Sequence, residues 1–277
     1  MEISESNITQ IIMQTINTLF ENLFSSIDNS IYAILDDITF IDISILHDSY
    51  FDKIFGTSTS NGILLIANSL LLGFLIYYSV HFAISYFTSS QIERPYQFIF
   101  KILLAGIFMN CSLFLCEKII DLNSNISLAV RNIGEELYNK NICFSGLNTE
   151  LNLVLNSNDS FNIFSLDGII KSLSSVGLFN LIFSYSLRYI MIKVFVLISP
   201  FAFLCLCTNK SNWFFKTWLR GFISLLFLQI LISLILLISF SINFNSEIFS
   251  KFMYIGCIYA LIKANFYINS IIRWHFY

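Results

Sequence analysis

The chain has 277 residues, of which 56% are hydrophobic and 12% are charged, with a formal net charge of −3. Soluble globular proteins carry about 25% charged residues, so this composition excludes an ordinary soluble domain and indicates a membrane protein. The apolar residues form long continuous runs instead of the alternating pattern of a membrane β-barrel. We therefore expect an all-α, polytopic membrane protein.

Residues 1–61 form an acidic segment that contains nine acidic groups, one base and no run long enough to cross a bilayer. Apolar residues recur in it at steps of three and four from Ile8 to Ile34, which predicts an amphipathic helix. Such a helix lies on the bilayer, packs against its own bundle or binds a partner. The start of the chain has no positively charged region and no cleavage site, so we do not expect a removable secretory signal. We expect residues 1–61 to lie outside any span, as an extracytoplasmic region according to the orientation derived below.

Two apolar runs follow within residues 62–116. The first, Gly62–Phe87, has no formal charge and exceeds the roughly 20 residues that a helix needs to cross hydrocarbon. The second, Phe98–Cys116, is shorter, and Lys101 at its start can extend its ammonium toward the interface. We expect both runs to be transmembrane helices.

Residues 117–175 are polar and rich in Asn and Ser, with seven acidic and four basic groups, and we expect them to form an extracytoplasmic loop. Residues 176–277 hold three further apolar regions, which cover Val176–Cys207, Phe222–Phe244 and Phe252–Ile272. The first of these is either one tilted helix or a re-entrant segment followed by a span.

The distribution of Lys and Arg predicts the orientation, because short loops rich in these residues stay in the cytoplasm. The 88–101 loop, the 208–221 loop and the C-terminus all carry bases, and the 208–221 loop has no acid. Both loops can be cytoplasmic only if 176–207 crosses the membrane once. We therefore expect about five transmembrane helices in the cell membrane, with the N-terminus out and the C-terminus in.

Motifs for catalysis and metal binding are missing from the sequence. The six cysteines include no C-x-x-C pair, and no phosphate-binding loop, zinc-protease motif or serine–histidine set is present. No Asp or Glu lies inside an apolar run, so paired acids for a proton or ion path are also missing. We expect a protein that is not an enzyme and that uses no cofactor or metal.

Two bases, Arg188 and Lys193, interrupt the third apolar region. They lie five residues apart, about 140° around a helix, so they do not share one face. If the span begins near Tyr189, both side chains can extend to the outer interface. Otherwise they mark a polar surface inside the protein or along a translocation path, because a charge in the bilayer centre costs ~2.5–3.5 kcal/mol.

The end of the same region combines a proline with an aromatic and basic loop. Pro200 lacks an N–H and is expected to kink its helix. The indoles of Trp213 and Trp218, together with Lys216 and Arg220, match the pattern that anchors a helix at the cytoplasmic interface. Bases among aromatic residues could also contact nucleic acid, and anchoring is the preferred interpretation.

The stretch from Arg188 to Phe240 resembles the TrbL family, which comprises polytopic inner-membrane subunits of VirB-type type IV secretion and conjugation systems. In that family an apolar helix with an "sPfa"-like break leads into a short basic loop, an aromatic segment and a long apolar helix that carries Gln. The matching residues are Ser199, Pro200, Phe201, Trp213, Phe215, Trp218, Leu219 and Gln229. The match covers about a fifth of the chain, which is shorter than the family and lacks its long cytoplasmic tail.

The resemblance implies a non-enzymatic structural subunit of a conjugative channel, in contact with membrane lipid and with the ATPase, pilin or stalk, and scaffold subunits. It also implies a homo-oligomer and allows transient contact with the transferred DNA. The alternative is a subunit of a small-solute permease or export channel. Paired acids, or broken helices in two corresponding halves of the chain, would be evidence for that class. A third class, an immunity or holin-like protein, does not need two polar outer regions of about 60 residues each.

Overall fold

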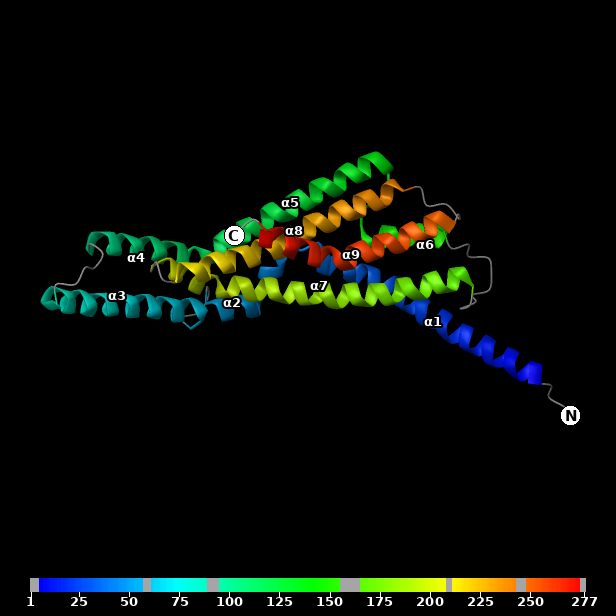
Figure 1. The fold of residues 1–277 in the computed structure, drawn as a ribbon, viewed down its shortest axis with the longest axis horizontal. Coiled ribbons are helices and arrows are strands. Elements are labelled where there is room, and N and C mark those ends of the chain that lie inside the picture. Colours follow the sequence, from blue (N-terminus) through cyan, green and yellow to red (C-terminus); the bar gives the residue numbers. More distant parts are fainter. Residues whose placement is uncertain are drawn as a thin grey trace. The chain divides into compact units, whose positions relative to one another are not determined.

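The computed structural model describes residues 5–56, 61–88, 95–154, 165–207, 211–242 and 248–274. Over these ranges the chain is helical and has no strand, which confirms the all-α prediction (Figure 1). The α-helices are α1 (Glu5–Thr39), α2 (Ser49–Phe55), α3 (Ile63–Thr88), α4 (Pro95–Asn110), α5 (Ser112–Tyr138), α6 (Phe144–Val154), α7 (Leu166–Leu204), α8 (Asn212–Ser241) and α9 (Ile248–Trp274). Short 3₁₀ turns cover Ile43–Leu46 and Cys205–Cys207.

Contacts divide the chain into two compact units. Unit 1 comprises Met1–Phe40, Asn125–Tyr189 and Phe227–Tyr277, and unit 2 comprises Ile41–Ser124 and Ile190–Leu226. Helices α5, α7 and α8 therefore contribute residues to both units.

Unit 1 packs around an apolar core to which α1, α6, α7, α8 and α9 contribute. Its buried side chains recur at three- and four-residue steps, which is the spacing of one helix face. They include Ile31, Tyr32 and Leu35 of α1, Phe144 and Leu147 of α6, Leu178, Leu181 and Tyr185 of α7, Leu228, Ile232 and Leu236 of α8, and Tyr254, Ile258 and Leu261 of α9. The hydroxyls of two core tyrosines, Tyr32 and Tyr254, lie 3.3 Å apart and form a hydrogen bond with each other.

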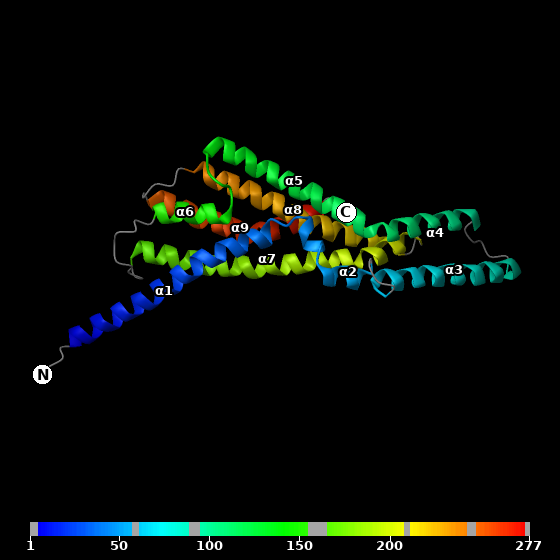
Figure 2. The ribbon, with the colours of Figure 1, turned by 180° about the vertical axis from the view of Figure 1, so that it is seen from behind.

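Unit 2 contains the hairpin of α3 and α4, which run side by side (Figure 2). The ring centroids of Tyr78 and Phe98 lie 3.5 Å apart in a stacked arrangement between the two helices. Farther along, the amides of Asn68 and Asn110 each donate to the other's oxygen at 3.3 Å. This reciprocal pair lets two asparagines sit on otherwise apolar helices.

Three helices are long and apolar enough to cross a membrane, namely Ile63–Phe87, Gly168–Cys207 and Asn212–Ser241. A fourth span results if α4 and α5, which bend by 58° at a break near Cys111, form one broken crossing. By length and composition the described chain is thus a multi-helix membrane protein. Within the described residues, helix α9 is not among these candidates.

The polar region 117–175 is largely helical where it is described, although its composition predicts a loop. Helix α5 continues from Ser112 to Tyr138, and α6 follows at Phe144–Val154. Several of its small and polar residues are buried, including Asn123 and Ser127, as is Cys116 just before the region. Their spacing places them on the packed side of α5, so Asn and Ser here belong to a helix–helix interface.

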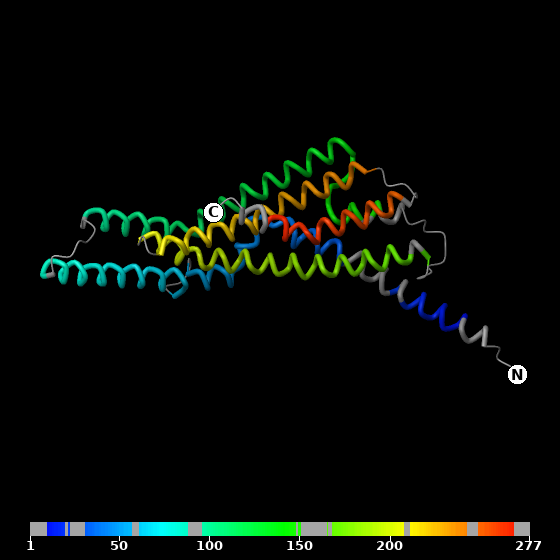
Figure 3. Tube along the Cα trace, in the orientation of Figure 1, coloured from blue at the N-terminus to red at the C-terminus, as the bar shows by residue number. Residues whose placement is uncertain are grey.

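The third apolar region forms one continuous helix, α7, and the alternative of a re-entrant segment does not apply to it (Figure 3). At 1.5 Å per residue its 39 residues extend about 58 Å, compared with about 30 Å of hydrocarbon. Membrane helices tilt by up to about 40°, which shortens the projected length by only about a quarter. A membrane crossed by α7 therefore leaves part of this helix outside the hydrocarbon.

Candidate functional site

A buried arginine lies at the centre of the polar groups in unit 1. Arg188, on α7, is 1% exposed. Its Nη1 donates to the carbonyl oxygen of Thr39 at 3.1 Å, and its Nη2 donates to Oε1 of Gln229 at 3.4 Å. The guanidinium thus connects α7 to the end of α1 and to α8.

The partner on α1 explains how a cation is tolerated there. Thr39 is the last residue of α1, and the final carbonyls of a helix have no intrahelical partner and carry the negative end of its dipole. The last turn of α1 contains no basic residue of its own. Arg188 therefore supplies, from α7, the cation that the C-terminus of α1 lacks.

Hydroxyl groups extend the polar contacts from Gln229 along α8. Ser233 Oγ donates to the Gln229 carbonyl at 3.0 Å, and the hydroxyls of Ser233 and Ser127 lie 2.7 Å apart. Thr39, Ser127, Arg188, Gln229 and Ser233 are all buried, and we call these five residues the polar seam. The seam joins four helices of unit 1, and its groups can hydrogen-bond and position but include no nucleophile paired with a base.

Tyr185 adds a further anchor on the same face of α7, three residues before Arg188. Its hydroxyl donates to the Leu261 carbonyl of α9 at 3.1 Å, and its side chain is 1% exposed. Helix α9 is thereby fixed to α7 beside the polar seam.

The sequence allows either an interfacial or an enclosed position for Arg188 and Lys193. In the structure the two side chains differ in burial. Arg188 turns inward, so its guanidinium is enclosed by protein instead of extending to an interface. Lys193 is half-buried and belongs to unit 2.

Pro200 is buried within α7, which continues past it to Leu204. Because Pro200 has no N–H, the carbonyl of Val196, four residues earlier, loses its helical donor. Ser199 Oγ donates to that carbonyl at 2.7 Å. The Ser199 hydroxyl thus replaces the hydrogen bond that Pro200 cannot donate to the Val196 carbonyl. Membrane helices tolerate internal prolines when side chains satisfy the freed backbone groups in this way.

The two indoles of the basic loop have different environments in unit 2. Trp213 is 65% exposed, as an interfacial anchor needs to be, and Lys216 is exposed as well. Trp218 is 5% exposed, donates from Nε1 to the Phe195 carbonyl at 2.9 Å and stacks on Phe222. Its indole therefore fastens α8 to α7 inside the protein. Arg220, two residues on, is half-buried.

A second polar contact lies at the N-terminus of α6, and no sequence motif predicts it. The Asp36 carboxylate accepts from the backbone N–H groups of Phe144 at 2.7 Å and Ser145 at 3.0 Å, and from Ser145 Oγ at 2.6 Å. It serves as the N-cap of a helix that begins 108 residues later in the chain. Sequence spacing cannot reveal a cap supplied from so far away.

Cys143 lies beside this cap, and its sulfur accepts from the Gly146 N–H at 3.2 Å. Burial, followed by the negative charge of Asp36, raises the pKa of the Cys143 thiol. The thiol is therefore a poor nucleophile at neutral pH. Within the described ranges, no group of three or more His, Cys, Asp or Glu side chains could hold a metal ion.

Comparisons of this chain with protein-family models, with curated proteins and with solved structures found no match.

Proposed function

We propose that the chain is a structural membrane subunit of a conjugative type IV secretion channel, which supports transfer of a DNA–protein substrate and assembly of the pilus or stalk. The observation that carries the proposal is the resemblance of residues 188–240 to the TrbL family. Two residues of that stretch, Arg188 and Gln229, hydrogen-bond to each other in unit 1. This contact supports the proposal because it connects α7 and α8, the two helices that carry the resemblance, through the arginine of one and the glutamine of the other.

The proposed layout has five spans in the cell membrane, with the N-terminus out and the C-terminus in. Three of them correspond to the long apolar helices α3, α7 and α8. In this layout the second crossing is assigned to the bent pair of α4 and α5. The fifth is assigned to α9, Ile248–Trp274. The Lys263 ammonium lies 5.7 Å from the Tyr259 ring centroid, an attraction that lowers the cost of placing this base on a spanning helix.

Protease treatment of intact spheroplasts tests this orientation. A tag at the N-terminus should be digested from outside while a tag at the C-terminus survives, and the reverse pattern would refute the layout.

In the proposed assembly the chain contacts an ATPase on the cytoplasmic side, pilin or stalk subunits outside and scaffold subunits in the membrane. We expect no catalytic role, because the polar seam positions helices and holds no reactive pair.

Affinity purification of the tagged full chain from membranes of its own host tests the proposed assembly. We expect a VirB-type ATPase and pilin or scaffold subunits to co-purify in amounts comparable with the chain, after mild crosslinking. A tagged α-helical membrane protein of similar size and abundance from the same host is the matched control. Recovery of solute-binding or transport-energising subunits instead would favour the permease alternative and refute this function.

A further inference from the structure

Three helices of unit 1 contact the end of α1. The Phe40 N–H donates to the Asp36 carbonyl at 3.0 Å and closes the final turn of this helix. We call residues 36–40 the terminal turn. The Asp36 carboxylate on this turn holds the start of α6, and the Thr39 carbonyl accepts from Arg188 of α7.

The third contact with the terminal turn comes from α5. The guanidinium carbon of Arg131 lies 4.1 Å from the centroid of the Phe40 ring. A cation in this position is attracted by the negative face of the ring. The Phe40 ring also lies 6.4 Å, between centroids, from the ring of Phe144, the first residue of α6. Phe40 therefore connects both α5 and α6 to the turn that Arg188 holds.

The three contacts share one short piece of backbone, so each affects the others. The last carbonyls of a helix have no intrahelical partner, and helix ends fray unless other groups hold them. Arg188 holds the Thr39 carbonyl, and Asp36 lies three residues earlier on the same turn. If the turn unwinds, the Asp36 carboxylate moves away from the N–H groups of α6. Contacts that share a backbone segment in this way are not energetically independent.

Cys143 reports the state of the α6 start. Its sulfur accepts from the Gly146 N–H at 3.2 Å, and it lines a polar cavity of about 300 Å³ that gives a small reagent access to the thiol. Asp36 and Arg131 shift the pKa of this thiol through their charges, and Arg188 is not among the groups that do so. A substitution at Arg188 therefore changes the reactivity of Cys143 only through the structure.

We propose that the terminal turn of α1 couples the start of α6 to Arg188 of α7, so that loosening either contact loosens the other. Such coupling is reciprocal by thermodynamic necessity. A change at α6 is thus felt in the polar seam, where Arg188 also contacts Gln229 of α8. The coupling does not depend on the secretion function, since it rests on contacts within unit 1 alone.

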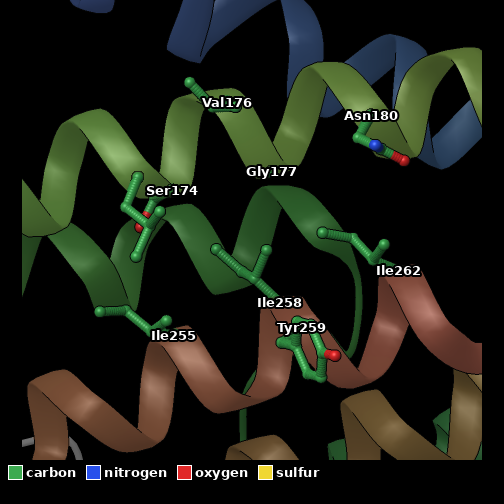
Figure 4. Close-up of a pocket in the computed structure, with 9 residues that line it drawn as sticks. Ser174, Val176, Gly177, Asn180, Ile255, Ile258, Tyr259 and Ile262 are labelled. Carbon is green, nitrogen blue, oxygen red and sulfur yellow. The ribbon is translucent and has the colours of Figure 1, made fainter.

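Helix α7 also packs on α9, through contacts that do not involve the terminal turn. Figure 4 shows Gly177 of α7 and Ile258 of α9 in the groove between these helices. A Cβ on Gly177 would lie 2.7 Å from Cγ2 of Ile258, so Gly177→Ala disturbs this packing. Tyr185→Phe removes the hydrogen bond from Tyr185 to the Leu261 carbonyl. Both substitutions disturb α7 away from Arg188 and serve as matched controls.

Alkylation of the full chain in native membranes tests the coupling. Iodoacetamide is applied at fixed pH, and mass spectrometry follows the peptides that contain Cys143 and Cys257. Cys257 is half-buried on α9 in the same unit, so it reports general loosening of unit 1. Arg188→Leu should raise the Cys143 rate at least threefold and leave the Cys257 rate within 1.5-fold. The two control substitutions should leave the Cys143 rate within 1.5-fold.

A double substitution tests whether the effect passes through Asp36. Asp36→Ala alone already releases the start of α6, so adding Arg188→Leu to it should raise the Cys143 rate by less than a further 1.5-fold. A second single variant, Phe40→Leu, keeps an apolar side chain but removes the ring that Arg131 and Phe144 contact. It should raise the Cys143 rate at least twofold even if Arg188→Leu reaches the membrane poorly.

Four results would overturn the proposal. The first is an unchanged Cys143 rate in Arg188→Leu or in Phe40→Leu. The second is an equal rise at Cys257, which would show that unit 1 loosens as a whole. The third is an equal rise in Gly177→Ala or Tyr185→Phe. The fourth is a full threefold effect of Arg188→Leu on top of Asp36→Ala, which would show that the two contacts act independently.

Discussion

Replacing Arg188 by leucine is expected to reduce conjugative transfer at least tenfold while leaving the amount of protein in the membrane within twofold of the intact chain. The substitution removes two hydrogen bonds from a charged donor, to Thr39 and Gln229, which contribute about 1.5–3 kcal/mol each. It also removes a buried charge whose insertion costs about 2.5–3.5 kcal/mol. Loss of the charge penalty offsets about half or more of the two lost hydrogen bonds, so the change in stability is limited and the loss of transfer is one of helix positioning.

The conservative replacement should be the more damaging one for stability. Arg188→Lys keeps the buried charge but replaces the fork by a single ammonium that cannot serve both acceptors in the same geometry. Gln229→Leu likewise keeps the charge and removes one of its acceptors. We expect both variants to denature in detergent at lower temperature than Arg188→Leu, as measured by thermal unfolding of purified protein.

Lys193→Leu is the matched control, since Lys193 is a half-buried base on the same helix. It should retain transfer within threefold. If Arg188→Leu transfers normally at normal protein level, Arg188 has no functional role. If Arg188→Leu unfolds at lower temperature than Arg188→Lys, removal of the buried charge does not offset the two lost hydrogen bonds.

Replacing Asp36 by alanine is expected to release the start of α6. Three hydrogen bonds to the Asp36 carboxylate are lost, and a charged N-cap contributes on the order of 2 kcal/mol. Cys143, immediately before α6, reports the change. Its thiol pKa is raised by burial and by Asp36, so removing the carboxylate lowers that pKa and enlarges the thiolate fraction at a given pH.

Alkylation of Cys143, followed by mass spectrometry of its peptide, measures this effect. The rate at pH 8 should rise at least fivefold in Asp36→Ala, and the midpoint of its pH profile should move to lower pH. Asp37→Ala, which removes the exposed neighbouring acid, should leave both unchanged. Equal rates in the two variants would show that Asp36 does not hold α6.

The helical class and most helix positions could be predicted because length and continuous hydrophobicity are local properties. The periodicity from Ile8 to Ile34 lies within α1, and the apolar runs correspond to α3, α4, α7, α8 and α9. Helices α5 and α6 were missed because a segment rich in Asn and Ser looks like a loop, although Asn123 and Ser127 are buried in α5. The break after Asn110 carries no proline or glycine that would have marked it.

The candidate site was predictable only in part, for a physical reason particular to membrane proteins. The buried and exposed sides of α7 are both apolar, so hydrophobic periodicity does not show which side is buried. Arg188 therefore could not be placed inside or outside, and the burial of Trp218 against Phe195 and Phe222 could not be foreseen. Thr39 and Asp36 act through partners more than a hundred residues away, which a single sequence does not reveal.

Transfer frequency of the host's mobile element, from a donor that lacks this gene, tests the central claim most directly. The secretion function predicts loss of transfer, with recovery when the intact chain is supplied and no recovery when Arg188→Leu is supplied at equal membrane level. Unchanged transfer from the donor that lacks the gene would contradict the secretion function. The alternative function, a subunit of a small-solute permease, would then be favoured for this multi-helix membrane protein.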